Sequence, residues 1–396
     1  MISVTKLIVG DEYSGDALRY RPGASRMKHG TTAGHGPVVV WNMTRTCNLR
    51  CRHCYMDADE KAHTGELTTA EAKAFIDDLA EFRSPALLFS GGEPLVRSDF
   101  FELAAYARDR GVRPTLSTNG TLITQDAAKK IKEVGVTYVG ISLDGLADVN
   151  DDFRGREGAY AAAMRGIQNC VAVGQRVGLR FTINAHNVRE MDPIFDFIEA
   201  EHIDRACFYH LVYSGRGEAM AEEDVTPAQS RAALATILRR TRDFAARGLK
   251  KEILTVDNHC DGVYLYLTAK AEGNEPLARR IWEFLAMNGG NRSGIAFGEV
   301  DPEGNVHPDQ FTQHHTFGNV RARKFSEIWQ DTTHPILAGL KDRKPLLRGR
   351  CAACRFLNVC NGNFRTRAEA RTGDFWASDP ACYLTDEEIG VGGDGQ

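Results

Sequence analysis

The 396-residue chain lacks a long hydrophobic run, an excess of positive charge and an internal repeat. A membrane-spanning helix needs about 20 apolar residues, and no stretch approaches that length. The N-terminal sequence MISVTKLIVGDEYSGD has no charged start followed by an apolar block, so no secretion signal is expected. The formal net charge of −4 offers no basic surface for nucleic acid. These absences predict a cytoplasmic protein without a nucleic-acid partner or a membrane span.

Ten cysteines are present, and without a secretion signal they indicate metal ligands in a reducing compartment, not disulfides. Seven of them fall into two groups, one near each end of the chain. Cys170 lies in a predicted helix and Cys207 in a predicted strand, so both are expected in the core. Cys260, in the polar string DNHCDG, could be a core residue or a ligand.

The first group is Cys47, Cys51 and Cys54, spaced C-x3-C-x2-C in the string CNLRCRHCY. Three thiolates on one short loop can bind three irons of a [4Fe–4S] cluster and leave the fourth iron open to a small molecule. The alternative is a zinc loop. Zinc loops usually combine two C-x2-C pairs, and no second pair lies nearby. The spacing therefore favours the cluster.

From Val38 onward, short apolar strands alternate with amphipathic helices, which indicates a parallel sheet. Capping boxes at Thr68 with Glu71 and at Thr226 with Gln229 predict two helix starts. Six strands are expected, in VVVWNMT, ALLFS, TLSTNG, VGISLDG, LRFTIN and ACFYHLVYS. The predicted fold class is α/β: a partial (β/α)6 TIM-type barrel with its site at the C-terminal strand ends, followed by a small α+β domain.

Four segments are predicted along the chain. Residues 1–36 form a loosely ordered lead-in, residues 37–215 the partial barrel, and residues 216–290 a helical bridge packed on the barrel. Residues 291–396 form an auxiliary domain. It begins with a hairpin in IAFGEV, DPEG and NVHP, continues with the short helix KFSEIWQD, and ends with the second cysteine group.

Polar motifs follow three of the predicted strands: GGEP at residues 91–94, STNG at 117–120 and SLDG at 142–145. Together with the cysteine string, in this order, they resemble the signature of the radical S-adenosylmethionine (SAM) superfamily. The resemblance implies a SAM-binding [4Fe–4S] cluster and reductive cleavage of SAM to a 5′-deoxyadenosyl radical. It also implies that Glu93 meets the SAM ammonium group and that Tyr55 lies near adenine. The implied cofactor-binding residues are Tyr55, Gly91, Gly92, Glu93, Ser117, Asn119, Ser142 and Asp144.

The second group is Cys351, Cys354, Cys360 and Cys382. Four thiolates suit either a tetrahedral zinc ion or a fully ligated [4Fe–4S] cluster, and the spacing leaves both open. The order of hairpin, short helix and cysteines resembles the SPASM/twitch extensions of radical SAM enzymes, which implies an auxiliary [4Fe–4S] cluster. A full SPASM domain has cysteines for two such clusters. Here Asp309 and Phe364 stand at two of those cysteine positions, so one auxiliary cluster is expected.

Longer strings, among them FYHLVYSGRG at residues 208–217 and NGGNRSGIAFGEVDPEGNVHPDQF at 288–311, resemble the tetrapyrrole-modifying radical SAM proteins, most closely those of heme d1 biosynthesis. The resemblance implies a didecarboxysiroheme-type iron tetrapyrrole that loses two propionate side chains. Sister proteins of alternative heme synthesis remove acetate side chains or decarboxylate propionates and share much of this pattern, so the exact reaction stays open. A flavodoxin or ferredoxin is the expected electron donor.

A carboxylate-rich macrocycle needs cationic partners, and Arg154, Arg180 and Arg216 are the candidates, although each could instead form an ion pair within the protein. His210 is a candidate ligand of the substrate iron or acid–base group, with a structural strand histidine as the alternative. In the auxiliary region, one of three histidines could face the substrate: His307, His314 or His315.

Two other functions would use parts of the same sequence pattern. A peptide-modifying maturase would use the same machinery, but it is expected to carry a peptide-binding domain before the barrel, and 36 residues are too few for one. An iron–sulfur electron carrier would have no use for the SAM motifs.

Overall fold

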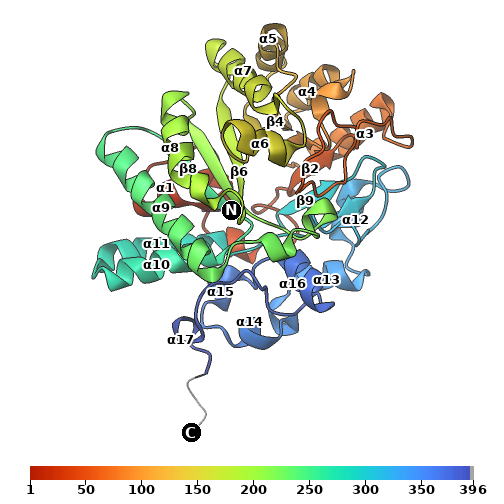
Figure 1. Cartoon of the computed structure of the whole chain (residues 1–396). Coiled ribbons are helices and arrows are strands. Elements are labelled where there is room, and N and C mark those ends of the chain that lie inside the picture. Colours follow the sequence, from red (N-terminus) through yellow and green to blue (C-terminus); the bar gives the residue numbers. More distant parts are fainter. Residues whose placement is uncertain (393–396) are drawn as a thin grey trace.

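A computed structural model describes residues 1–392, so residues 393–396 of the predicted auxiliary domain lie outside the described part. Ten strands form one open sheet in the order β1-β8-β7-β6-β5-β4-β3-β2-β9-β10, and helices surround it (Figure 1). The strands are β1 (Ile2–Ser3), β2 (Val38–Asn42), β3 (Ala86–Ser90), β4 (Arg113–Thr118), β5 (Val139–Ser142), β6 (Val177–Ile183), β7 (Arg205–His210), β8 (Glu252–Val256), β9 (Phe297–Val300) and β10 (Val306–His307).

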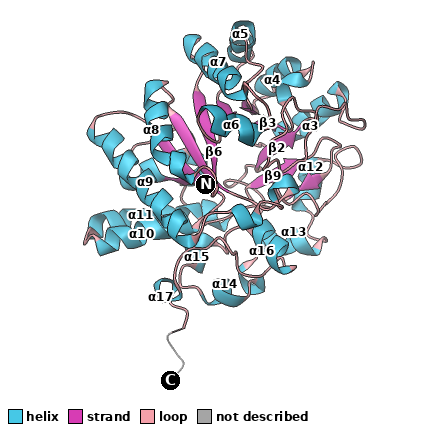
Figure 2. Ribbon diagram, viewed as in Figure 1, coloured by secondary structure: helices cyan, strands magenta, loops and turns pink. Residues whose placement is uncertain are grey.

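The six predicted barrel strands are β2 to β7, and they pair in parallel in chain order. Figure 2 shows these strands inside a ring of helices. The sheet stays open because β1 and β10 are its two edges. The α/β partial-barrel class is therefore confirmed. The helices between these strands are α3 (Thr69–Glu81), α4 (Phe100–Asp109), α5 (Gln125–Glu133), α6 (Ala147–Arg154), α7 (Ala159–Ala172) and α8 (Met191–Ala200).

Both predicted capping boxes are present. The Thr68 side chain accepts from the Glu71 backbone and Glu71 caps in return, which starts α3. Thr226 and Gln229 do the same at the start of α9 (Pro227–Ala246).

Residues 216–290, predicted as a helical bridge, contain α9, α10 (Cys260–Ala271) and α11 (Glu275–Asn288), but also the strand β8. Strand β8 pairs in parallel with β7 and so extends the barrel sheet. All five of its residues are buried. A strand buried on both faces lacks the alternation that makes strands visible in sequence, which explains why the pattern missed it.

Residues 1–36, expected to be loosely ordered, begin with β1, α1 (Val4–Ile8) and α2 (Asp16–Arg19). Strand β1 pairs antiparallel with β8, and Ile2, Val4 and Leu7 are almost fully buried. The Thr5 hydroxyl donates to the Lys251 carbonyl at 2.9 Å. These elements are too short to show a helical or strand period in the sequence.

The hairpin predicted for the auxiliary region is formed by β9 and β10, and β9 joins the barrel sheet by pairing with β2. The predicted helix KFSEIWQD is α12 (Phe325–Gln330). The remaining helices gather at the lower side of Figure 1 and are α13 (Pro335–Lys341), α14 (Gly349–Ala353), α15 (Leu357–Cys360), α16 (Arg365–Thr372) and α17 (Asp386–Ile389). Within residues 1–392, no helix has the length and apolar character to cross a membrane.

Aromatic side chains fill the space between β7 and the helices outside it. The Phe208 ring on β7 is fully buried and stacks on Phe195 at 5.0 Å between ring centroids. We expect Phe208→Ala to lower the free energy of unfolding by about 3–5 kcal/mol, because it leaves a large cavity in a packed core. Chemical denaturation followed by circular dichroism measures this. The control Val171→Ala, at a position 36% exposed, should change the value by less than about 0.5 kcal/mol; equal losses in both variants would contradict the packing described.

Candidate active site

The three N-terminal cysteines follow β2 and lie over the C-terminal ends of the parallel strands. Cys47, Cys51 and Cys54 line one cavity of about 970 Å³. Most of the sequence-predicted site residues come together around it, at the ends of β3 to β7 and in the loops beyond them. Those lining the cavity are Tyr55, Gly91, Gly92, Ser117, Asn119, Ser142, Arg154, Arg180, His210 and Arg216.

Nitrogen donors surround the thiols. The Leu49 backbone donates to the Cys47 sulfur at 3.4 Å, and the Asn119 amide lies 3.9 Å from the same atom. Burial raises the pKa of the Cys47 thiol to about 12, so a thiolate at this position needs a metal and hydrogen-bond donors to stabilise it. Three thiols facing one cavity, with such donors behind them, fit a [4Fe–4S] cluster.

Two arginines brace the cysteine loop. Arg154 donates to the Cys51 sulfur at 3.5 Å and pairs with Asp144. Arg216 donates to the carbonyl oxygens of Cys51 at 2.8 Å and Ala58 at 3.1 Å. Both were predicted to bind substrate carboxylates. These contacts occupy much of each guanidinium, so the geometry favours a role in positioning the loop.

The GGEP loop presses against the backbone of the cysteine segment. Gly91 has φ of +130°, and a Cβ atom there would lie 2.5 Å from the Thr44 carbonyl oxygen. A Cβ atom at Gly92 would lie 2.4 Å from the Thr46 carbonyl oxygen. The Gly92 backbone amide donates to the Thr44 carbonyl oxygen at 2.7 Å. Glycine is therefore required at both positions for this close approach.

Glu93 and Asp144, both predicted to contact SAM, lie behind the cavity wall and do not line it. Glu93 is fully buried and accepts from the Thr118 hydroxyl at 2.8 Å and the Asn119 amide at 2.8 Å. Burial raises its pKa to about 6. Asp144 accepts from the Thr182 amide at 2.8 Å besides pairing with Arg154. In this structure the two carboxylates shape the strand-end loops.

Tyr55 and His210 line the cavity, and each is held by a polar partner. The Tyr55 hydroxyl donates to the Asn42 amide oxygen at 2.9 Å. His210 Nε2 lies 3.0 Å from the Asp261 carboxylate. Burial opposes protonation of His210, but Asp261 outweighs it and raises the pKa. Because Asp261 engages Nε2, a role of His210 as an iron ligand would have to use Nδ1.

A second, larger cavity lies inside the sheet; its empty space, including the part open to solvent, is about 1480 Å³. It shares with the first cavity a junction made of Arg180, Tyr209, Asp257, Gln310 and Phe311. The two cavities are therefore contiguous. Sequence reasoning singled out only Arg180 among these five residues as a candidate for the site; Tyr209, Gln310 and Phe311 were part of the longer strings that carry the family resemblance, without a role of their own.

Guanidinium groups line the larger cavity. Arg113 stands at the start of β4, Arg180 lies in β6, and Arg292 lies in the loop after α11. Arg180 stacks on the Tyr209 ring at 4.9 Å, and Arg292 donates to the Gly30 carbonyl at 2.9 Å. Within residues 1–392, none of the three arginines forms an ion pair with a carboxylate. Within the described residues, the wall thus carries three guanidinium groups that form no ion pair, together with the carboxylates of Asp257 and Asp309.

The four C-terminal cysteines line a pocket of about 450 Å³ beside α14 and α15, and Cys260 from the start of α10 joins them. A hydrogen bond from the Cys260 thiol lowers the pKa of Cys382. The polar string around Cys260 was the only sequence signal for this. Cys170 and Cys207 are buried, as predicted. His307, His314 and His315 line neither of the two large cavities.

The chain is similar to several known proteins. The family description "Radical SAM superfamily" matches residues 41–198. The chain is 55% identical to the Fe-coproporphyrin III synthase of Methanosarcina barkeri, over 98% of this chain and 99% of that protein. It is 42% identical to the pre-heme d1 synthase of Dinoroseobacter shibae, over 95% of this chain and 92% of that protein.

Solved structures share the fold. Streptococcus suis SuiB bound to precursor peptide SuiA superimposes with a TM-score of 0.70 at 17% identity, over 89% of this chain and 76% of SuiB. Native anSMEcpe with bound AdoMet gives a TM-score of 0.68 at 18% identity, over 89% of this chain and 95% of that chain. At these identities the likeness concerns the fold alone.

The Glu93 carboxylate joins the loops after β3 and β4. We expect Glu93→Gln to lower the free energy of unfolding by about 1–3 kcal/mol. The NH2 group of glutamine cannot accept hydrogen bonds, so donors that now bond to the carboxylate would lose their acceptor. Thermal and chemical denaturation of the variant measure the loss. The control Glu133→Gln changes an exposed carboxylate in α5 and should leave stability unaltered. An unchanged stability of Glu93→Gln would show that the carboxylate does not hold these loops.

Proposed function

The chain belongs to the radical SAM superfamily, as an enzyme of the heme synthase and pre-heme d1 synthase type, and we propose that it removes carboxylate-bearing side chains from a didecarboxysiroheme-type iron tetrapyrrole. The proposed first step is SAM cleavage at the three-cysteine loop. The proposed substrate site is the larger cavity inside the sheet.

The observation that carries this proposal is the contiguity of the two cavities, one at the cysteine loop and one lined by three arginines that form no ion pair within residues 1–392. A tetrapyrrole is broad, and its edge carries several carboxylates. Guanidinium groups bind carboxylates with strong, directional hydrogen bonds. Arg113, Arg180 and Arg292 therefore supply the charge that such a substrate needs, next to the SAM pocket.

Two positions that carry cluster-binding cysteines in a full SPASM domain face the proposed substrate cavity in this chain. Asp309 and Phe364, at two of those positions, line the larger cavity. Asp309 turns its carboxylate to its own loop and accepts from the Thr312 hydroxyl at 2.8 Å. The Phe364 ring packs on Phe311 at 5.5 Å. Because no second auxiliary cluster is expected here, the space beside Asp309 and Phe364 is available to the substrate.

Cys47, Cys51 and Cys54 would hold the SAM-binding [4Fe–4S] cluster, which when bound supplies the electron that cleaves SAM to a 5′-deoxyadenosyl radical. Arg154 and Arg216 would fix the loop that carries these thiols. Glu93 and Asp144 would act through the loops they anchor. The residues proposed to contact SAM directly are those that line the first cavity: Tyr55, Gly91, Gly92, Ser117, Asn119 and Ser142.

Two reactions fit this machinery, and both start from a carboxylate-bearing side chain. Fe-coproporphyrin III keeps its propionates, so a route to it from didecarboxysiroheme removes acetates. The 55% identity to a synthase of that product, over nearly the whole chain, favours acetate removal. Propionate removal, predicted from the heme d1 resemblance, is the second candidate and is supported by the 42% identity to pre-heme d1 synthase.

An anaerobic assay with reconstituted protein, dithionite, SAM and didecarboxysiroheme tests the proposal. Mass analysis should show a tetrapyrrole lighter by acetate-sized losses, with matching 5′-deoxyadenosine. Propionate-sized losses would select the heme d1 reaction. SAM cleavage with an unchanged tetrapyrrole would contradict the proposed substrate, and related tetrapyrroles and then peptides would be tested next.

We expect Cys47→Ala to abolish SAM cleavage, with at least about a 100-fold loss of 5′-deoxyadenosine formation, because the cluster then lacks one of its three thiolates. The control Cys170→Ala changes a buried thiol outside both cysteine groups and should retain cleavage. Full cleavage by Cys47→Ala at undiminished iron content would refute the role of the loop.

We further propose an auxiliary [4Fe–4S] cluster at Cys351, Cys354, Cys360 and Cys382. Cys354→Ala should lower the iron content by one cluster, retain SAM cleavage, and reduce tetrapyrrole product by about 10-fold or more. Iron analysis and the anaerobic assay measure the three quantities. Loss of SAM cleavage together with product would mean that these cysteines maintain the fold instead.

A further inference from the structure

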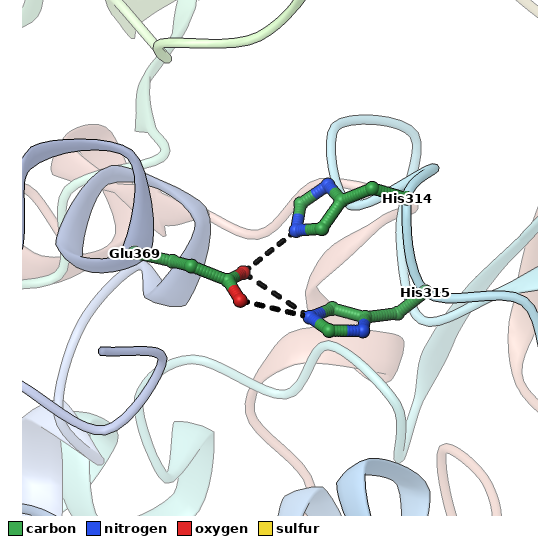
Figure 3. Close-up of side chains that lie close together, drawn as sticks. All are labelled: His314, His315 and Glu369. Atoms are coloured by element: carbon green, nitrogen blue, oxygen red, sulfur yellow. Dashed lines mark hydrogen bonds and ion pairs between the residues drawn. The ribbon is translucent and has the colours of Figure 1, made fainter. Parts of the chain in front are cut away.

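We propose that His314, His315 and Glu369 bind one divalent transition-metal ion, with zinc as the first candidate. This site is distinct from both cysteine groups and does not depend on the proposed function. Figure 3 shows the two imidazole rings, on adjacent residues of the loop after β10, both turned toward the carboxylate on α16.

The donor atoms already have the spacing of metal ligands. His314 Nε2 lies 2.6 Å from Glu369 Oε2, and His315 Nε2 lies 3.1 Å from Oε1. One donor from each residue falls within 4.8 Å of the other two. Ligands bound at about 2.0–2.2 Å to one zinc ion lie roughly 3–3.5 Å from each other, so a small movement would admit the ion.

The charge at this cluster also favours a cation. Within residues 1–392, the Glu369 carboxylate pairs with no lysine or arginine, only with the two histidines. Nearby arginines are committed elsewhere: Arg367 pairs with Asp379, and Arg371 pairs with Glu222. The carboxylate therefore has no permanently charged cationic partner among these residues, and a divalent ion would supply one.

Neighbouring contacts hold the ligands in place. The hydroxyl groups of Thr312 and Thr366 lie 2.7 Å apart in a buried hydrogen bond, which joins the loop to α16. Thr366 precedes Glu369 by three residues, so the two face the same side of the helix. His307 Nδ1 donates to the His315 carbonyl at 3.1 Å. Hydrogen bonds that hold the ligand residues in place orient them and raise the affinity for the metal ion.

Two imidazoles and one carboxylate are a ligand set that suits zinc and ferrous iron. The His314 side chain is 51% exposed, so water can complete the coordination. The ion would fasten α16 to the loop that continues from Gln310 and Phe311, which form part of the junction between the two large cavities. We therefore assign it a structural role in fixing that wall.

The test uses the cluster-loaded protein, titrated anaerobically with zinc and passed through a desalting column. Elemental analysis should find about one zinc per chain. Glu369→Gln and His314→Ala should each weaken zinc binding by about 10-fold or more. The matched control is His186→Ala, which removes a solvent-exposed imidazole that pairs with a single carboxylate, that of Glu223; its zinc content should equal that of the unaltered protein.

Zinc-edge X-ray absorption provides a second measurement. Only nitrogen and oxygen neighbours are expected, because a zinc ion at a cysteine site would show sulfur at about 2.3 Å. Equal zinc binding by Glu369→Gln and the unaltered protein would overturn the proposal, as would a sulfur signal or no bound zinc. His314→Ala changes an exposed side chain, so it tests the site even if Glu369→Gln does not fold.

Discussion

The close backbone approach of the GGEP loop to the cysteine segment is the constraint on which the site depends. The amides of Gly92 and Glu93 donate to the carbonyls of Thr44 and Thr46, at 2.7 and 3.0 Å. The Glu93 carboxylate then accepts from the Thr118 hydroxyl and the Asn119 backbone amide. The side-chain amide of Asn119 in turn donates to the Cys47 sulfur. A continuous set of contacts therefore runs from β3 through β4 to the first cysteine. It sets where a cluster can sit relative to the strand ends.

Arginines serve two purposes, and their partners distinguish them. Arg154 pairs with Asp144, Arg216 donates to two backbone carbonyls, and both hold the cysteine loop. Arg113, Arg180 and Arg292 have no carboxylate partner within residues 1–392 and line a cavity. A partly buried guanidinium without an ion-pair partner destabilises the fold. Under the proposed function, a carboxylate of the substrate would offset that cost.

The sequence predicted what local patterns determine. Strand and helix alternation gave the parallel sheet, and because parallel strands end at one edge, the residues following them were expected to converge. Gly91, Ser117 and Ser142 do line one cavity. Features that depend on distant pairing could not be predicted in this way. Strand β8 lacks alternation, and Cys260 lies more than 90 residues from the cysteines it joins. The sequence left Arg154 open between a substrate contact and an internal ion pair, and only the fold shows Asp144 beside it.

Under the proposed function, the choice between acetate and propionate removal is made at the junction of the two cavities. The two side chains differ by one methylene, and both end in a carboxylate, so an arginine that binds by charge discriminates weakly between them. Position discriminates more strongly, since a misplacement of about 1 Å can cost about 100-fold in rate. Under the proposed function, the residues that set this position are Arg180, Tyr209, Gln310 and Phe311, which lie between the SAM pocket and the larger cavity. The Phe311 ring contacts both Tyr55 and Phe364, so under the proposed function the SAM pocket and the auxiliary region together set the position of the macrocycle.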